Sequence, residues 1–143
     1  MKTYCLAPLL LLALWCGSAC AHTDEYFDQK QTAHGGQVRM AGPYHLELVV
    51  HGPEVTLYLT DHAGDPIASV DGSAKVIIRS GRRNRAVVVL MPAGDNRLRG
   101  SAKFKLGKTN DVSVLVALPG ADPQRAQFRL DRNGKPLPKR KSN

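Results

Sequence analysis

Residues 44–61 read YHLELVVHGPEVTLYLTD, and this stretch decides the fold class. Apolar and polar side chains alternate on both sides of HGPE, which predicts two half-buried β-strands because successive strand side chains point to opposite faces. The HGPE segment itself favours a turn. Pairing Val50 with Val55 brings the apolar faces of both strands into register, and a slip by one residue would reverse them. The neighbours across the other face are then His45 with Thr60 and Glu47 with Tyr58.

The same alternation recurs along the chain, between clusters of turn-forming residues. Further strands are expected at residues 37–40, 74–79, 85–91, 97–105, 112–118 and 125–130. They predict an all-β domain over residues 34–130, an antiparallel sandwich or Greek-key barrel of about seven to eight strands, immunoglobulin-like in outline. Gly100 interrupts the inward row of its strand and is expected to mark a bulge.

The first 21 residues have the pattern of a secretory signal peptide. Lys2 precedes an apolar run at residues 6–15, and Ala19-Cys20-Ala21 fits a signal-peptidase site, so we expect cleavage before His22 and an exported, periplasmic protein. A lipoprotein anchor at Cys20 is the alternative. All three cysteines lie in this segment, so the mature chain is expected to hold no thiol and no disulfide. No later stretch reaches the roughly 18 apolar residues of a membrane span.

Two polar segments flank the predicted domain. Residues 22–33 predict a flexible lead-in, with a frayed helical turn around Tyr26 and Phe27. Residues 131–143 form a tail rich in basic residues and proline, which we expect to be disordered.

Charge is unevenly divided along the chain, whose formal net charge is +8. Residues 22–72 hold two Lys or Arg against eight Asp or Glu, and residues 73–143 hold seventeen against four. All five histidines belong to the acidic part. The division predicts two surfaces of different chemistry.

The acidic part offers ligands for a divalent transition metal, since imidazole suits Cu, Zn and Ni and a carboxylate can complete a site. His45 and His51 are separated by about 20 Å on one strand and cannot share an ion. The predicted hairpin brings His62 near His45, and His34 precedes the first strand. The candidate ligands are His34, His45 and His62, with Glu47, Asp61 and Met40 to complete the site. The alternative is that these histidines are solvated surface residues.

The basic part offers a second candidate surface. Arg79, Arg82, Arg83 and Arg85 surround a turn, and Arg97, Arg99, Lys103 and Lys105 form an outward row on one predicted strand. Arg82, Arg83, Arg97 and Arg99 could hold an anionic envelope surface or an acidic partner protein. The alternative is a solvated edge that discourages aggregation. Nucleic acid is not an expected partner, because no aromatic residue is interleaved with the basic ones.

Three runs carry a family resemblance: His34-Gly35-Gly36-Gln37-Val38, Gly42-x-Tyr44-His45-x-Glu47-Leu48-Val49, and Val55-x-Leu57-Tyr58-Leu59-x-Asp61-His62-x-Gly64-x-Pro66. In these the chain resembles small exported β-sandwich domains that occur alone or beside the periplasmic adaptor proteins of heavy-metal efflux systems. The resemblance implies a role near metal export, with His34, His45 and His62 as the positions that could touch metal and an efflux adaptor as the partner. Adaptor hairpin segments and a methionine cluster are absent from the sequence.

The sequence therefore predicts an exported, non-enzymatic binding protein, an accessory factor in periplasmic divalent metal binding or metal efflux and tolerance. The alternative is an interaction module whose basic face and tail bind an anionic envelope component or a partner protein. Catalysis is not expected, because no serine lies in a GxSxG context and the carboxylates of Asp61 and Asp65 straddle a turn.

Overall fold

The computed structural model describes residues 24–82 and 84–138, and antiparallel strands dominate this part of the chain. One short helix, α1 (Asp24–Asp28), precedes eight strands. These are β1 (Gln37–Ala41), β2 (Tyr44–His51), β3 (Glu54–Thr60), β4 (Ser73–Ser80), β5 (Asn84–Pro92), β6 (Arg97–Ser101), β7 (Asn110–Ala117) and β8 (Gln124–Leu130). They form a single sheet in the order β1-β2-β3-β6-β5-β4-β7-β8. The predicted all-β class is confirmed.

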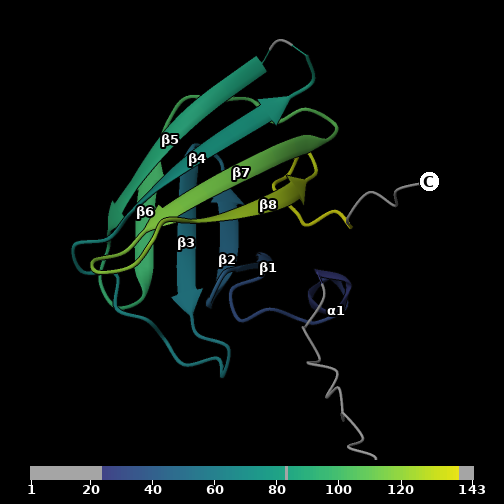
Figure 1. Ribbon diagram of the computed structural model, residues 1–143. Helices are drawn as coiled ribbons and strands as arrows, with labels where there is room; N and C mark the ends of the chain where they lie inside the picture. Colours follow the sequence, from purple (N-terminus) through teal and green to yellow (C-terminus); the bar gives the residue numbers. More distant parts are fainter. Residues whose placement is uncertain (1–23, 83, 139–143) are drawn as a thin grey trace, which may run out of the picture.

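The sheet folds over into two layers, β1-β2-β3-β6 and β5-β4-β7-β8, with the core between them (Figure 1). Alternate positions of each strand supply the inward side chains, as the period of two requires. Each large aliphatic side chain removed from water contributes roughly 1.5–3 kcal/mol, so this core is the main source of stability. The largest fully buried side chains include Phe128, Leu46, Leu48, Leu57, Leu59, Ile78, Leu90, Leu98 and Leu130.

The hairpin of β2 and β3 has the predicted register. Val50 lies opposite Val55, and the outer-face pairs His45 with Thr60 and Glu47 with Tyr58 are confirmed. Strand alternation alone was therefore enough to place the candidate metal ligands of this hairpin on one face.

The strand predicted at residues 97–105 is shorter in the structure, because β6 ends at Ser101. Its register with β3 runs unbroken through Gly100, so the expected bulge is not present in that ladder. Glycine is needed there for a different reason. A Cβ atom at Gly100 would lie 2.1 Å from the carbonyl oxygen of Val89, where β5 and β6 come close together.

The lead-in that was expected to be flexible packs on the outer face of the first layer from residue 24 onward. Its predicted helical turn is present as α1. The Phe27 ring meets the His45 ring edge-on, with ring centres 4.9 Å apart. The carboxylate of Asp28 accepts a hydrogen bond of 2.7 Å from the buried guanidinium of Arg39. The sequence prediction missed this packing because these contacts join the lead-in to residues that lie far along the chain.

The start of the tail, which was predicted to be disordered, forms a turn at residues 131–137. The carboxylate of Asp131 accepts hydrogen bonds from the N–H groups of Asn133 and Lys135. The N–H of Leu137 then donates to the carbonyl oxygen of Arg129 at 2.8 Å. Residues 139–143, and residues 1–21 with Cys20 and the predicted signal peptide, lie outside the described chain.

The two layers meet along two seams. At the first seam, the side chain of buried Gln37 joins β1 to the end of β8: its Nε2 donates to the carbonyl oxygen of Leu137 and its Oε1 accepts from the N–H of Arg129, both at 2.8 Å. At the second seam, β5 and β6 pair only through Met91 with Arg99 and Pro92 with Leu98. The sandwich is therefore closed on one side and partly open on the other.

Within residues 24–82 and 84–138, no helix is long and apolar enough to cross a membrane.

Candidate functional site

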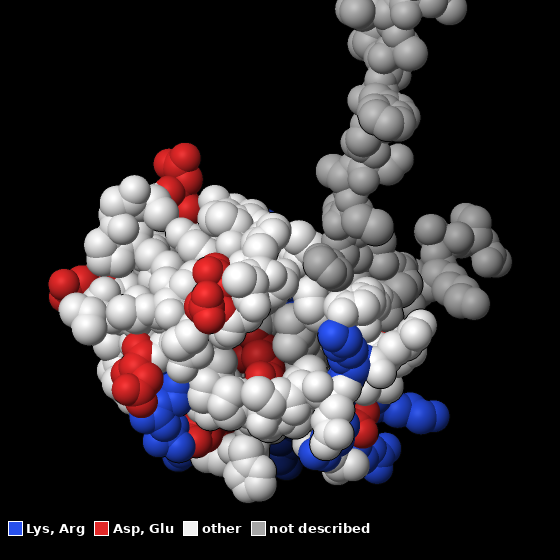
Figure 2. Space-filling view, turned by 90° about the horizontal axis from the view of Figure 1, so that it is seen from below, with Lys and Arg blue, Asp and Glu red and all other residues white. Residues whose placement is uncertain are grey.

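The loops lie in two groups, one at each end of the sandwich, because neighbouring strands are antiparallel. Residues 42–43, 61–72, 93–96 and 118–123 form the acidic end. These four loops contain no Glu, Lys or Arg, and their charged residues are all aspartates: Asp61, Asp65, Asp71, Asp95 and Asp122. Figure 2 views this end and shows acidic side chains spread across it, with basic side chains confined to the lower half of the view.

The opposite end is basic. Its loops are residues 52–53, 81–82, 102–109 and 131–138, and Asp131 is their one acidic residue. Their cationic side chains are Arg82, Lys103, Lys105, Lys108, Arg132 and Lys135. Arg83, which was predicted to belong to the basic surface, lies outside the described chain. The uneven charge along the sequence thus becomes a charge polarity along the long axis of the molecule.

His34, one of the predicted metal ligands, is engaged by two residues of the β2–β3 hairpin. Its Nδ1 lies 2.8 Å from Glu47 Oε2, and because a carboxylate can only accept, the imidazole nitrogen donates. Its ring stacks on the Tyr58 ring, with centres 3.6 Å apart and planes 3° from parallel. These residues line a small cavity of about 230 Å³ beneath the lead-in.

Glu47 is buried by this arrangement, and its carboxylate is nonetheless held in the ionised form. Burial alone would raise the pKa of Glu47, but the hydrogen bonds from the His34 ring and from the N–H groups of Gly36 and His34 outweigh burial and lower the pKa below its ordinary value. Glu47 therefore serves to hold the lead-in against β2.

His45 and His62 lie together at the acidic end. Their ring centres are 5.0 Å apart and their planes are 13° from parallel. The Nε2 of His62 is 3.2 Å from the carbonyl oxygen of Gly42, so this nitrogen donates. Met40 lies opposite His45 in the β1–β2 ladder. The hairpin geometry predicted the proximity of His62 to His45, and the structure has it.

Asp61, the remaining predicted ligand, is occupied by its own turn. Its carboxylate accepts the N–H groups of Ala63 at 2.8 Å and Asp65 at 2.9 Å. Turns of this kind are a common use of aspartate, because its short side chain can bond the backbone two or more residues on.

Apart from Asp61, the predicted ligands thus divide into two groups. His34 and Glu47 bond to each other, whereas His45, His62 and Met40 lie together. No group of three or more His, Cys, Asp or Glu side chains is placed to hold a metal ion in the described part of the chain. The near-parallel rings of His45 and His62 do not converge on one point, since the lone pairs of an imidazole lie in the plane of its ring.

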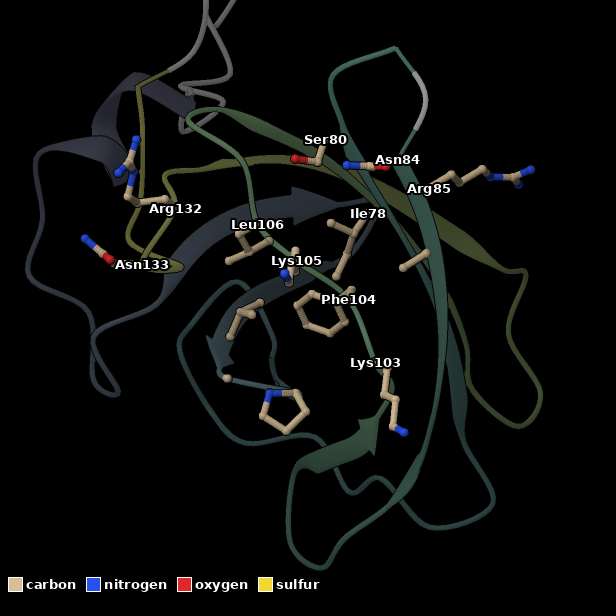
Figure 3. Close-up of a pocket in the computed structure, with 14 residues that line it drawn as sticks. Ile78, Ser80, Asn84, Arg85, Lys103, Phe104, Lys105, Leu106, Arg132 and Asn133 are labelled. Atoms are coloured by element: carbon tan, nitrogen blue, oxygen red, sulfur yellow. The ribbon is translucent and has the colours of Figure 1, made fainter.

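A larger cavity, of about 840 Å³, opens at the basic end (Figure 3). Its floor is apolar and is made by Val50, Ile78, Ala86, Phe104 and Leu106. Four exposed cationic side chains surround it: Arg85, Lys103, Lys105 and Arg132. None of the fourteen lining residues is Asp or Glu. This combination accommodates an apolar group and an anion side by side.

The predicted basic row on one strand is divided by the end of β6. Arg99 pairs with Glu54, and Arg97 lies 3.7 Å from the carboxylate of Asp95 at the acidic end. Lys103 and Lys105 instead border the larger cavity. The cation surface is therefore a ring around a cavity and not a stripe along a strand.

Sequence reasoning missed this cavity. One signal was available, because residues 102–106 read AKFKL and alternate apolar and basic side chains directly after Gly100 and Ser101. The alternation indicates a chain with one face on the core and one face basic, but it cannot tell a paired strand from an unpaired one.

Comparison with models of protein families, with curated proteins and with solved structures gives no match to the chain. Function has to be inferred from the side chains at the two ends.

Proposed function

We propose that this protein is an exported, non-enzymatic binding module whose basic end holds an anionic partner. The observation that carries the proposal is the larger cavity, with its apolar floor and its four cationic side chains, Arg85, Lys103, Lys105 and Arg132. Export rests on the signal-peptide pattern of residues 1–21.

Two physical arguments support an anionic partner. A concave surface lined by charges of one sign focuses the electric field and raises the local concentration of opposite charge. An apolar floor adds affinity through burial of a partner's apolar groups, and concave apolar pockets with a few polar groups are the usual form of binding sites. The acidic end would in addition orient the molecule, because it repels an anionic surface.

The test uses two anionic probes, poly-L-glutamate and vesicles that contain phosphatidylglycerol, at low and high salt. Lys103→Glu with Lys105→Glu reverses two cations at the cavity. Lys75→Glu with Arg125→Glu makes the same change in net charge on exposed positions of β4 and β8, away from the cavity. We expect salt-sensitive binding to one probe or both, weakened about tenfold or more by the first pair and little by the second.

Two outcomes would contradict the proposal. One is that neither probe binds the parent protein at low salt. The other is that both double variants weaken binding equally, which would indicate attraction to net charge without a site.

A second candidate function is reversible binding of a divalent transition metal at the acidic end, as the resemblance to domains beside metal-efflux adaptors suggests. The proximity of His45 and His62 favours it, with Met40 opposite His45. Rotation of one ring would let both imidazoles reach one ion, since neutral imidazole suits Cu, Zn and Ni. The role would be that of an accessory factor in metal tolerance, and binding would weaken at low pH as protons compete.

Calorimetric titration with Cu(II) and Zn(II) tests this candidate. We expect His45→Ala with His62→Ala to weaken binding at least tenfold, and His51→Ala, at the opposite end of β2, to have no effect. Absence of binding by the parent, or equal affinity in the double variant, would exclude the metal site.

A further inference from the structure

The second seam of the sandwich has an open strand edge. From Asn84 to Val88, β5 is paired with β4 on one side, and in the described chain no strand pairs with its other side. Val87 and Val89 are 45% and 57% exposed on the outer face of this strand. An open edge beside exposed apolar side chains is the usual template for pairing with another chain.

Across the seam, residues 103–106 are open as well. The N–H of Ala102 donates to the carbonyl oxygen of Pro53, and the N–H of Gly107 donates to the side chains of Ser80 and Asn110. Between these points, the described peptide groups of residues 103–106 neither donate nor accept a backbone hydrogen bond. Backbone polar groups are nearly always paired, so water or a ligand must satisfy these groups.

Both open edges border the larger cavity. Asn84, Arg85 and Ala86 line it from β5, and residues 103–106 line it from the other side of the seam. Figure 3 shows Phe104 and Ile78 in the middle of the cavity, with Arg85 on one side and Arg132 on the other. The cavity is therefore a gap in the sheet, with unpaired backbone along its walls and apolar side chains on its floor.

We propose that this gap, which we call the acceptor slot, binds an extended acidic segment of a partner protein as an added β-strand. The inference rests on the proposed function and names its partner. A strand placed along β5 would hydrogen-bond to the open edge and present alternate side chains to opposite faces. Apolar side chains of the segment meet Ile78, Ala86 and Phe104, and Asp or Glu side chains meet the ring of cations.

A peptide satisfies the slot better than an anionic amphiphile would. An acyl chain could cover the apolar floor and place its head group among the cations. It would leave the peptide groups of residues 103–106 and of the β5 edge without protein partners, because a hydrocarbon chain carries no donors or acceptors. The unpaired backbone on both walls therefore selects for a peptide.

The test uses the mature chain, a seven-residue peptide that alternates Glu and Val, and a peptide of the same composition with the three Val together. Binding is measured calorimetrically, and exchange of the backbone amides is followed by NMR. We expect the alternating peptide to bind at least tenfold more tightly than its isomer. It should also slow amide exchange within residues 84–88 and 103–106, and Lys103→Glu with Lys105→Glu should weaken its binding.

Two N-methylated versions of the alternating peptide, blocked at the Val or at the Glu nitrogens, separate strand addition from charge attraction. At least one of them should lose binding, because N-methylation removes the donors that a strand needs. If neither loses binding, or if myristate binds the slot and the peptide does not, strand addition is wrong while an anion site at the basic end stands. If no anionic probe binds, the proposed function fails as well.

Discussion

The side chain of Glu47 holds the lead-in against the outer face of the sheet. It lies on the outer face of β2, where an uncovered carboxylate would be solvated, and the N–H groups of His34 and Gly36 reach it at 2.9 and 3.0 Å. Gly36 has no room for a side chain, because a Cβ atom would lie 2.4 Å from the carbonyl oxygen of Leu48. The lead-in therefore packs at this point through backbone groups, and the carboxylate is what binds them.

This arrangement predicts a pH-dependent contribution to stability. The pKa of Glu47 is lower in the folded chain than its ordinary value of 4.5, so its contribution is full above that value and is lost as the pH falls through the folded pKa. Replacing Glu47 by Gln should lower the free energy of unfolding at pH 7 by about 2 kcal/mol, because hydrogen bonds to a charged group are replaced by neutral ones. The difference between parent and variant should shrink as the pH falls below 4.5.

Urea unfolding monitored by circular dichroism across this pH range measures the difference. Glu54→Gln is the matched control, since Glu54 pairs with Arg99 on the exposed surface and such pairs contribute about 0–1 kcal/mol. A difference between parent and Glu47→Gln that stays constant with pH would contradict the assigned role of the carboxylate.

The elements of this fold were predictable where a repeating pattern specifies them. Alternation in residues 44–61 fixed the β2–β3 register, and with it the proximity of His45 and His62. Alternation could not predict where β6 ends. The apolar side chains of AKFKL, at residues 102–106, still face the core although the strand hydrogen bonds of β6 end at Ser101. Pairing is a property of two chain segments, and the pattern of one segment does not reveal it.

The turn at residues 131–136 was not predicted, although the sequence contains a pattern that indicates it. Asp131, Gly134 and Pro136 have the same spacing as Asp61, Gly64 and Pro66. The two segments form the same turn: each aspartate carboxylate accepts two backbone N–H groups, and each proline makes an isolated bridge, to Leu130 and Thr60 respectively. Comparison of the tail with the loop after β3 would therefore have predicted this turn.

The sequence of the lead-in contains a weaker signal for its packing on the sheet. Its contacts are made by Asp28 to Arg39 of β1 and by Phe27 and His34 to His45 and Glu47 of β2, and these partners lie at no fixed spacing along the chain. The aromatic pair Tyr26-Phe27 in an otherwise polar run was the one indication that this segment could cover a surface.

In the whole molecule, the antiparallel strands place the acidic loops at one end of the sandwich and the basic loops at the other. Loops that follow β1, β3, β5 and β7 lie at the acidic end, and loops that follow β2, β4, β6 and β8 lie at the basic end. Asp95 and Asp122 belong to the basic half of the sequence but to the acidic end of the fold. The polarity is thus sharper in the structure than along the chain. The sequence predicted one row of cations, whereas in the fold Arg97 lies beside Asp95 at the acidic end and Lys103 and Lys105 border the cavity at the basic end.

The two seams have opposite roles in this molecule. The first must be closed for the second to act as a slot, because a sandwich open on both sides would let its layers separate. At the first seam the side chain of Gln37, which is 2% exposed, bonds both Arg129 of β8 and Leu137 just beyond it. Replacing Gln37 by Leu would remove both bonds, together with a longer one of 3.4 Å from Gln37 Nε2 to the Asp28 carboxylate, and would leave the N–H of Arg129 and the carbonyl oxygen of Leu137 without these partners.

A buried polar group left unpaired costs about 1–3 kcal/mol. Because Arg129 and Leu137 are half-buried, Gln37→Leu should lower the free energy of unfolding by about 2 kcal/mol in urea titrations. Gln127→Leu is the matched control, because Gln127 is exposed on β8 and bonds only the hydroxyl of Ser113 across the strand pair. Its effect should be within about 0.5 kcal/mol, as is usual for surface positions. Equal effects of the two substitutions would mean that backbone packing, and not the Gln37 amide, closes the sandwich.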